Sequence, residues 1–225
     1  MQSIYLFLTI IKRSDEKEFV DFFLRKGVRP VHSSLCRGST TSETLDLLGL
    51  EHSEKMLLQT LVSTGKMYEL KDALTYEMNI DLPDRGIALA IPLTSLASKK
   101  TLDHILADQS DATSEIHVTT ERKIEMELIV TICIKGNSNA IMQLAKEAGA
   151  AGGTIMKAKG TASEADKFFG VSISDEKEII YIVAQKETKP DIMKAIASYT
   201  NDVGTHPLVF SLPVTETAGF RLLER

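Results

Sequence analysis

Two glycine turns carry the residues of this chain best suited to bind a small anion. Lys159 directly precedes Gly160, and Arg37 directly precedes Gly38. Backbone N–H groups in such a turn can form an anion-binding nest, and a neighbouring Lys or Arg adds charge-assisted hydrogen bonds. The two turns are therefore candidate sites for an anionic ligand.

The segment 160–170 is longer than a connection between two strands requires. It lies between the strand-like runs 153–159 and 177–185, which a hairpin loop of about two to five residues would join. Phe168 and Phe169 stand near its end, followed by Gly170. Two interpretations remain open: the aromatic pair covers the end of a small core, or it forms an apolar patch for a partner protein.

The motifs expected of an enzyme or a metal site are absent from the sequence. It contains no Walker-type, His-Glu-x-x-His or Gly-x-Ser-x-Gly motif. The histidines do not have metal-ligand spacing; they are His32, His52, His104, His117 and His206. We therefore predict a protein that is not an enzyme, with no catalytic residues and no metal site.

Charge and hydropathy restrict the partners and the location. The net charge of −5 and the pI near 5.6 argue against a nucleic-acid surface, which is normally basic. No apolar run approaches the roughly 18 residues of a membrane helix, so we expect no direct membrane insertion. Cys36 and Cys133 lie in apolar runs without a second cysteine nearby, which is typical of buried thiols in a reducing compartment. We predict a cytoplasmic protein.

The chain contains an internal repeat of domain length. Thr131, Gly149, Gly160 and Lys177 repeat an earlier set at a constant offset of 122 residues (131 − 9 for the threonines); that set is Thr9, Gly27, Gly38 and Lys55. Repeats of this length indicate duplicated domains, since solenoid units are much shorter. We predict a divergent copy over 1–98, a linker over 99–123 and a second copy over 124–225.

Each copy follows the order strand, helix, strand, strand, helix, strand. The first copy has expected strands at 4–11, 31–36, 56–62 and 87–91, with helices at 16–26 and 65–78. The second has strands at 126–135, 153–159, 178–185 and 208–212, with helices at 138–148 and 190–199. This order predicts an α+β fold of two tandem ferredoxin-like (βαββαβ) domains, each an antiparallel four-stranded sheet with two helices on one face. Between the copies we expect a short helix over 99–108 and an exposed linker over 109–120.

Residues 124–220 resemble the PII-like nitrogen regulatory proteins, in the branch with a shortened loop. The resemblance is carried by motifs in a fixed order: Gly153-Thr154-Ile155, Lys159-Gly160-Thr161, Lys167-Phe168-Phe169-Gly170, Glu176-Lys177-Glu178-Ile179-Ile180, and Leu212-Pro213-Val214 with Gly219. Residues 3–97 match more weakly, through Cys36-Arg37-Gly38 and Arg85-Gly86-Ile87-Ala88.

The resemblance implies a homotrimeric signal-transduction protein. It implies ATP, ADP or another adenine nucleotide bound in clefts between subunits, and a loop that reports occupancy to a regulated enzyme or transporter. Carried over by position, the ligand-binding residues are Thr154, Lys159, Gly160, Thr161, Arg37, Gly38, Ser39, Arg85 and Gly86. The loop residues that would contact the partner are Phe168, Phe169 and Gly170.

The chain departs from the family pattern at three places. The paired basic residues that follow the last strand in the family are missing, unless Arg221 and Arg225 replace them. The turn before the last strand of the second copy reads Gly204-Thr205-His206-Pro207, without the expected phosphate-contacting lysine. The modifiable tyrosine of the long-loop branch is absent from both copies. An alternative therefore stands beside the sensing function: a structural or assembly protein in which one copy has lost its ligand site.

Overall fold

The computed structural model describes two compact units. The described residues are 3–29, 31–39, 54–93, 107, 109, 125–159, 176–201, 204 and 206–219. Unit 1 comprises Met1–Leu35, Glu54–Ile124 and Pro213–Arg225, and unit 2 comprises Cys36–Ser53 and Glu125–Leu212. Each unit thus combines segments that are distant in the sequence.

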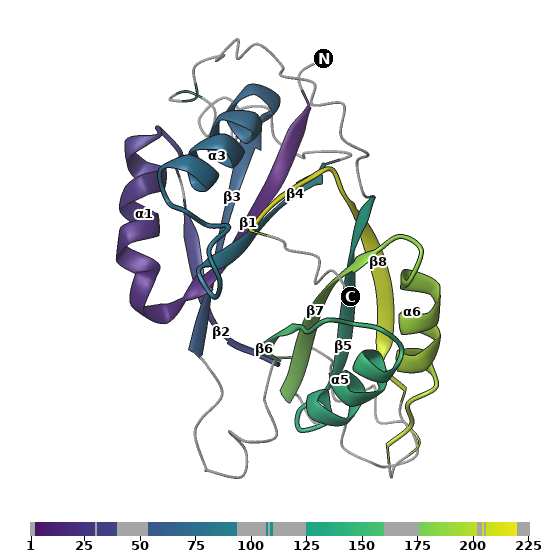
Figure 1. Ribbon diagram of the computed structural model, residues 1–225. Coiled ribbons are helices and arrows are strands. Elements are labelled where there is room, and N and C mark those ends of the chain that lie inside the picture. Colours follow the sequence, from purple (N-terminus) through teal and green to yellow (C-terminus); the bar gives the residue numbers. More distant parts are fainter. Residues whose placement is uncertain are drawn as a thin grey trace. The chain divides into compact units, whose positions relative to one another are not determined.

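Unit 1 places two helices on one face of its strands (Figure 1). Its elements are β1 (Ile4–Lys12), the short 3-10 helix η1 (Arg13–Asp15), α1 (Glu16–Arg25), most of β2 (His32–Gly38), β3 (Glu54–Ser63), α3 (Thr64–Tyr76), β4 (Gly86–Pro92) and, from the C-terminal tail, β9 (Glu216–Ala218). β1 lies between β3 and β4 and is antiparallel to both. The continuous apolar run at the start of the chain is therefore a central strand, as predicted.

The core of unit 1 forms where α1 and α3 cover the sheet. Phe19, Phe22 and Phe23 recur at helical spacing on α1 and are fully buried. They pack with Phe7 and Ile11, which alternate along one face of β1. This periodic match between a helix stripe and a strand face is what fixes α1 on the sheet.

Unit 2 repeats the arrangement with smaller core residues. Its elements are β5 (Met126–Ile134), α5 (Ser138–Glu147), β6 (Thr154–Lys159), β7 (Glu176–Gln185), α6 (Lys189–Ala197) and most of β8 (Leu208–Val214). Ile129 on β5, Ile141 on α5 and Ile192 on α6 are fully buried in one cluster. β7 pairs antiparallel with β5 and with β6.

The two copies keep a glycine after their first helix, at the position where the backbone has a positive φ. Gly27 and Gly149 follow α1 and α5 with φ values of 72° and 102°, which glycine adopts without strain. Both helices end in the same Schellman pattern, with N–H bonds from Val28 to the Phe23 carbonyl and from Ala150 to the Ala145 carbonyl. Gly27 is thus the C′ residue that the sequence predicted.

The prediction of two separate four-stranded sheets is wrong. The strands are hydrogen-bonded in the order β8-β5-β7-β6-β2-β3-β1-β4-β9, which is one nine-stranded sheet. β2 and β6, which the predicted fold leaves as edge strands, pair antiparallel. β9, a tail strand with no predicted counterpart, pairs with β4. The physical reason is that an edge strand exposes unpaired N–H and C=O groups, which these added pairings satisfy.

The region between the copies is described at only two residues. Gln109, at the start of the expected exposed linker, is 6% exposed. Its side chain accepts a hydrogen bond from the Ser63 N–H and donates one to the Leu61 carbonyl. The expectation of exposure is therefore wrong at this residue, while the helix expected over 99–108 lies outside the described residues apart from 107. None of the described helices has the length and hydropathy to cross a membrane.

Two equivalent threonines bury a hydroxyl group without a hydrogen-bond partner. Thr9 on β1 and Thr131 on β5 occupy matching positions of the two copies, and both are fully buried. Neither Oγ1 atom has a partner among the described residues. A buried, unsatisfied hydroxyl carries its desolvation cost without compensation.

We expect Thr9→Val and Thr131→Val each to raise the free energy of unfolding by about 1 kcal/mol, because an apolar group of the same shape removes that cost. Urea unfolding of the full chain measures the change. Thr188→Val is the matched control, since the Thr188 hydroxyl donates to the Gln185 carbonyl. The control is expected to lose stability, and a loss in Thr9→Val or Thr131→Val would contradict the prediction.

Candidate functional site

The structure brings four of the predicted ligand-binding residues together in unit 2. At the end of β2, Arg37 pairs with Ile155 and Gly38 pairs with Thr154. The Ser39 N–H continues the ladder by donating to the Gly153 carbonyl at 2.8 Å. Arg37 and Gly38 are strand residues of β2, so the glycine turn expected at this position is not formed. Thr154, from the second copy, is thus the direct strand neighbour of Gly38 from the first.

Lys159 lies at the opposite end of β6 from this cluster. Five residues separate it from Thr154, which corresponds to roughly 17 Å along a strand. Its side chain is exposed. Within the described ranges, no hydrogen bond or ion pair engages its ammonium group. Lys159 and Arg37, which the sequence treats as equivalent, therefore lie apart along β6.

Gly160, Thr161, Phe168, Phe169 and Gly170 lie outside the described residues.

Arg37 is held by polar groups of unit 2 around the start of α5. Its Nη2 donates to Ser138 Oγ at 2.9 Å and to Glu178 Oε1 at 3.3 Å. Its Nη1 donates to Asn139 Oδ1 at 3.3 Å. The guanidinium expected to contact an anionic ligand thus binds a carboxylate of the protein itself.

Glu178 is the centre of this cluster. It projects from β7, and its side chain is 7% exposed. Its Oε2 accepts hydrogen bonds from the backbone N–H groups of Gly136 and Ser138, at 3.1 and 3.3 Å. Asn137, the N-cap residue of α5, makes no capping bond with its own side chain. Glu178 therefore supplies the acceptor that the helix start lacks, in the position where an anion is favoured.

The environment of Glu178 keeps it charged. Burial alone would raise its pKa, but the hydrogen bonds from Ser138 and Gly136 and the charge of Arg37 lower the pKa below its ordinary value of 4.5. A carboxylate bound in this way stabilises the fold at pH values above 4.5.

Sequence reasoning missed the role of Glu178, although a signal for it exists. At the offset of 122 residues, Glu178 corresponds to Met56, which is a core residue of unit 1. A charged side chain at a position that is apolar in the other copy indicates a dedicated partner, because an isolated buried charge is very costly.

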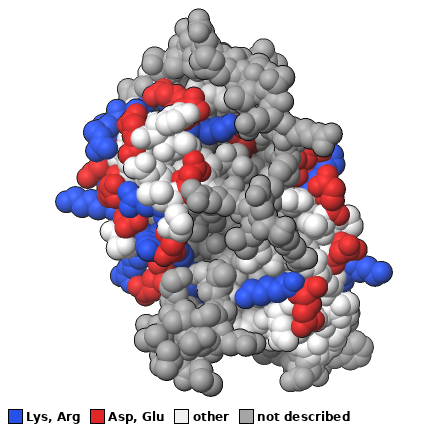
Figure 2. Space-filling view, viewed as in Figure 1, with Lys and Arg blue, Asp and Glu red and all other residues white. Residues whose placement is uncertain are grey.

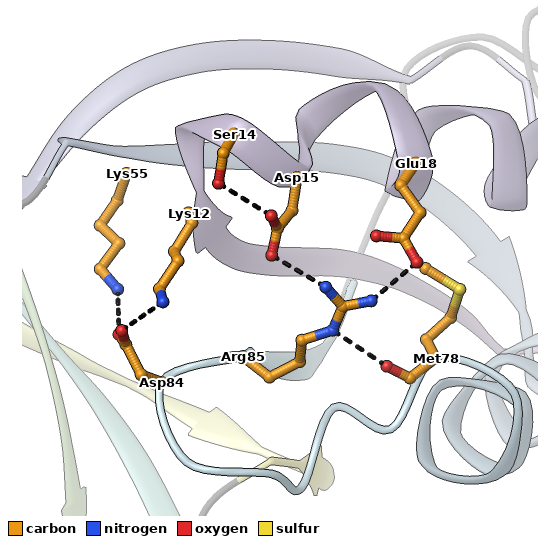
Figure 3. A network of polar contacts seen from close by, with 8 residues as sticks. All are labelled: Lys12, Ser14, Asp15, Glu18, Lys55, Met78, Asp84 and Arg85. Atoms are coloured by element: carbon orange, nitrogen blue, oxygen red, sulfur yellow. Dashed lines mark hydrogen bonds and ion pairs between the residues drawn. The ribbon is translucent and has the colours of Figure 1, made fainter.

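The Arg85-Gly86 turn of unit 1 carries a second ion-pair network (Figure 3). Arg85 donates to Glu18 Oε1 at 2.7 Å, to Asp15 Oδ2 at 3.0 Å and to the Met78 carbonyl at 3.2 Å. The hydrogen bond to Glu18 holds the pKa of the guanidinium above its ordinary value. Arg85 also lies over the Phe19 ring, at 5.3 Å from the centroid.

Asp84 neutralises two lysines beside this turn. Lys12 and Lys55 face each other across β1 and β3, where like charges repel. Asp84 accepts from both ammonium groups, at 2.6 and 2.8 Å (Figure 3). The basic residues around the turn are therefore matched by carboxylates from the same unit.

The C-terminal tail closes over the same turn. The Gly219 N–H donates to Asp81 Oδ1 at 2.7 Å. A Cβ at Gly219, whose φ is 74°, would lie 2.3 Å from the Gly86 carbonyl oxygen. Only glycine permits this approach, so the backbone of Gly86 is covered by the chain itself.

We also considered the described residues as metal ligands, as a reactive thiol and as a charged surface patch. No set of three or more His, Cys, Asp and Glu side chains among the described residues is arranged to hold a metal ion. Burial raises the pKa of Cys133 to about 11, so its thiol stays protonated. On the face drawn in Figure 2, the Lys and Arg side chains alternate with Asp and Glu over the described part of the chain.

We expect Glu178→Gln to lower the free energy of unfolding by about 1–3 kcal/mol at pH 7, because charged hydrogen bonds are lost. The folded-state pKa lies below the unfolded value, so the stabilisation is present above pH 4.5 and disappears as the pH falls through the folded-state pKa. Urea unfolding at several pH values measures the gap between wild type and variant. A gap that is independent of pH, or an equal effect of Glu147→Gln on the exposed side of α5, would contradict the prediction.

We expect Gly219→Ala to lower the free energy of unfolding by about 1–3 kcal/mol, because it combines backbone strain with a steric clash. Gly204→Ala is the matched control: its φ is 75°, and apart from its chain neighbours no described residue has an atom within 4 Å of the added Cβ. Thermal unfolding of both variants separates the strain, which they share, from the clash. Equal losses in the two variants would show that the tail does not pack against Gly86.

Comparison with known proteins does not assign a family. No family model and no curated protein matches the chain. Among solved structures, a point mutant of chlorite dismutase from Candidatus Nitrospira defluvii is 10% identical, with 95% of this chain and 91% of that chain covered. Its TM-score is 0.22, and at that value the likeness carries no argument about fold or function.

Proposed function

We propose that this protein is a PII-like regulatory protein, not an enzyme, that binds one small anionic ligand per chain through its second copy. In this proposal the ligand is of the adenine-nucleotide type, and Lys159 contributes the contacting charge at the base of the loop. The first copy serves a structural role and has lost its own ligand site.

The observation that carries this proposal is the state of the expected anion-binding arginines. Arg37 binds Glu178, and Arg85 binds Asp15 and Glu18. An incoming phosphate would have to replace these carboxylates. At Arg37 this would leave the buried charge of Glu178 without its partner, which is costly. At Arg85 it would break two partly exposed pairs. The Gly86 backbone is also covered by Gly219. These contacts favour a structural role for the first-copy residues.

Lys159 differs from these arginines in its availability. Its side chain is exposed at the end of β6, and no described residue pairs with its charge. A lysine in this state adds a charge-assisted contact to an arriving anion without breaking an existing one. This difference supports one site per chain.

The proposal extends to assembly and location, following the resemblance to the PII-like family. The chain acts as a homotrimer in the cytoplasm, and the loop 160–170 transmits ligand occupancy to a regulated enzyme or transporter. Light scattering of the purified protein tests the trimer, because a stable monomer or dimer at micromolar concentration excludes it.

The decisive test is calorimetry of the wild-type protein with ATP, ADP and cyclic adenine nucleotides. We expect one ligand per chain. We expect Lys159→Ala to weaken binding by about 1–3 kcal/mol, because a charged hydrogen-bond partner is lost. Arg85→Ala is expected to lower stability and leave the affinity unchanged.

Lys157→Ala is the matched control for Lys159→Ala, since Lys157 is an exposed lysine on the same strand and the same face. Equal losses in the two variants would reduce the effect to general charge. Two ligands per chain would show that the first copy retains a site. If the wild-type protein binds none of these nucleotides, the structural alternative replaces the sensing function.

A further inference from the structure

Lys159 is one of three charged residues that lie in a row across unit 2. β7 lies between β5 and β6, and the last pair of the β6–β7 ladder is Lys159 opposite Glu176. On the other side of β7, Lys135 directly follows β5, and its N–H donates to the Glu176 carbonyl at 3.2 Å. The Lys135 ammonium group binds Glu176 Oε2 at 2.8 Å. Glu176 is therefore flanked by one lysine on each side.

The three side chains lie on the same face of the sheet. Directly opposed residues of antiparallel strands project to one side, which places Lys159 and Glu176 together. The ion pair places Lys135 on that side too. Neighbouring strands lie about 4.8 Å apart, so roughly 10 Å separates the two lysine backbones across β7. The flexible four-carbon side chains of two lysines can converge over that distance.

The next row along β7 has no second lysine. There Lys157 lies opposite Glu178, but the residue on the other side of Glu178 is Cys133. Among the rows that cross β5, β7 and β6, the described residues therefore place two lysines around one carboxylate only in the row of Lys159.

The opposite end of β5 and β7 carries a similar ion pair that β6 does not reach. The Lys186 N–H donates to the Glu125 carbonyl, and the Lys186 ammonium group binds the Glu125 carboxylate. β6 begins at the residue opposite Tyr181, so it adds no side chain to this row. The two ends of the β5–β7 ladder thus have the same exposed pair, and they differ in the lysine that β6 adds to one of them.

The carboxylate between the two lysines restricts the kind of anion that can bind both. A single phosphate in contact with both ammonium groups would lie over Glu176, where like charges repel. Two linked phosphates can instead contact one lysine each, on either side of the carboxylate. The Lys135–Glu176 pair gives way to such a ligand at small cost, because its side chains are 48% and 64% exposed and exposed pairs contribute little stability.

We propose that Lys135 is a second phosphate-contacting residue of the site at Lys159, and that this site selects ligands with two or more linked phosphates. On binding, the Lys135 ammonium group exchanges the Glu176 carboxylate for a phosphate oxygen. Glu176 then acts as an internal competitor of the ligand. This inference rests on the proposed function at Lys159 and extends it to the class of ligand.

Calorimetry of the full chain with AMP and with ADP tests the proposal, because these probes differ by one phosphate. Wild type should bind ADP at least about tenfold more tightly than AMP, since a second charged contact forms. Lys135→Ala combined with Glu176→Gln removes the pair and keeps the net charge, and it should lower the preference for ADP by about tenfold. Glu176→Gln alone should strengthen ADP binding, because Lys135 is no longer engaged by a carboxylate.

Lys186→Ala combined with Glu125→Gln is the matched control, since it removes the similar pair at the other end of the ladder. It should keep the wild-type preference for ADP. Equal affinities of wild type for AMP and ADP, an unchanged preference in the Lys135→Ala, Glu176→Gln variant, or an equal loss in the control would overturn the role of Lys135 and leave Lys159 in place. A wild-type protein that binds neither nucleotide would overturn the proposed function, and this inference with it.

Discussion

The buried carboxylate of Glu178 is the interaction on which unit 2 depends. It supplies the acceptor for the uncapped start of α5, and it also binds the guanidinium of Arg37. A buried charge is tolerated only when its hydrogen bonds and its counter-charge are both present. The start of α5, the register of β7 and the end of β2 are therefore coupled, because displacing any one of them leaves this charge uncompensated.

In unit 1, charged side chains are also paired with opposite charges, but at the surface instead of in the interior. Asp84 lies between the ammonium groups of Lys12 and Lys55, and Arg85 lies between two acidic side chains. Exposed pairs of this kind contribute little stability individually. Their main consequence is that the basic residues around the turn are already paired with carboxylates of the same unit.

The sequence predicted local structure well and the joining of strands poorly. The apolar run of β1 and the glycine that ends α1 are encoded by neighbouring residues, so periodicity and composition reveal them. The pairing of Gly38 with Thr154 depends on residues more than a hundred positions apart, which no local pattern records. At the site, the basic residues could be predicted from the sequence, but the carboxylates that bind Arg37 and Arg85 could not. The sequence signal for Glu178 is the apolar Met56 at the equivalent position of the first copy.

The contribution of the tail to unit 1 has a consequence for biosynthesis. β9 pairs with β4, and Glu216 forms an ion pair with Lys71 on α3, so unit 1 is completed by residues near the end of the chain. When β4 has just been synthesised, the edge that later pairs with β9 is still open, and an open strand edge is prone to wrong pairing. That edge stays open until all of unit 2 has been synthesised. Unit 1, most of whose strands precede unit 2 in the chain, is thus completed only after unit 2.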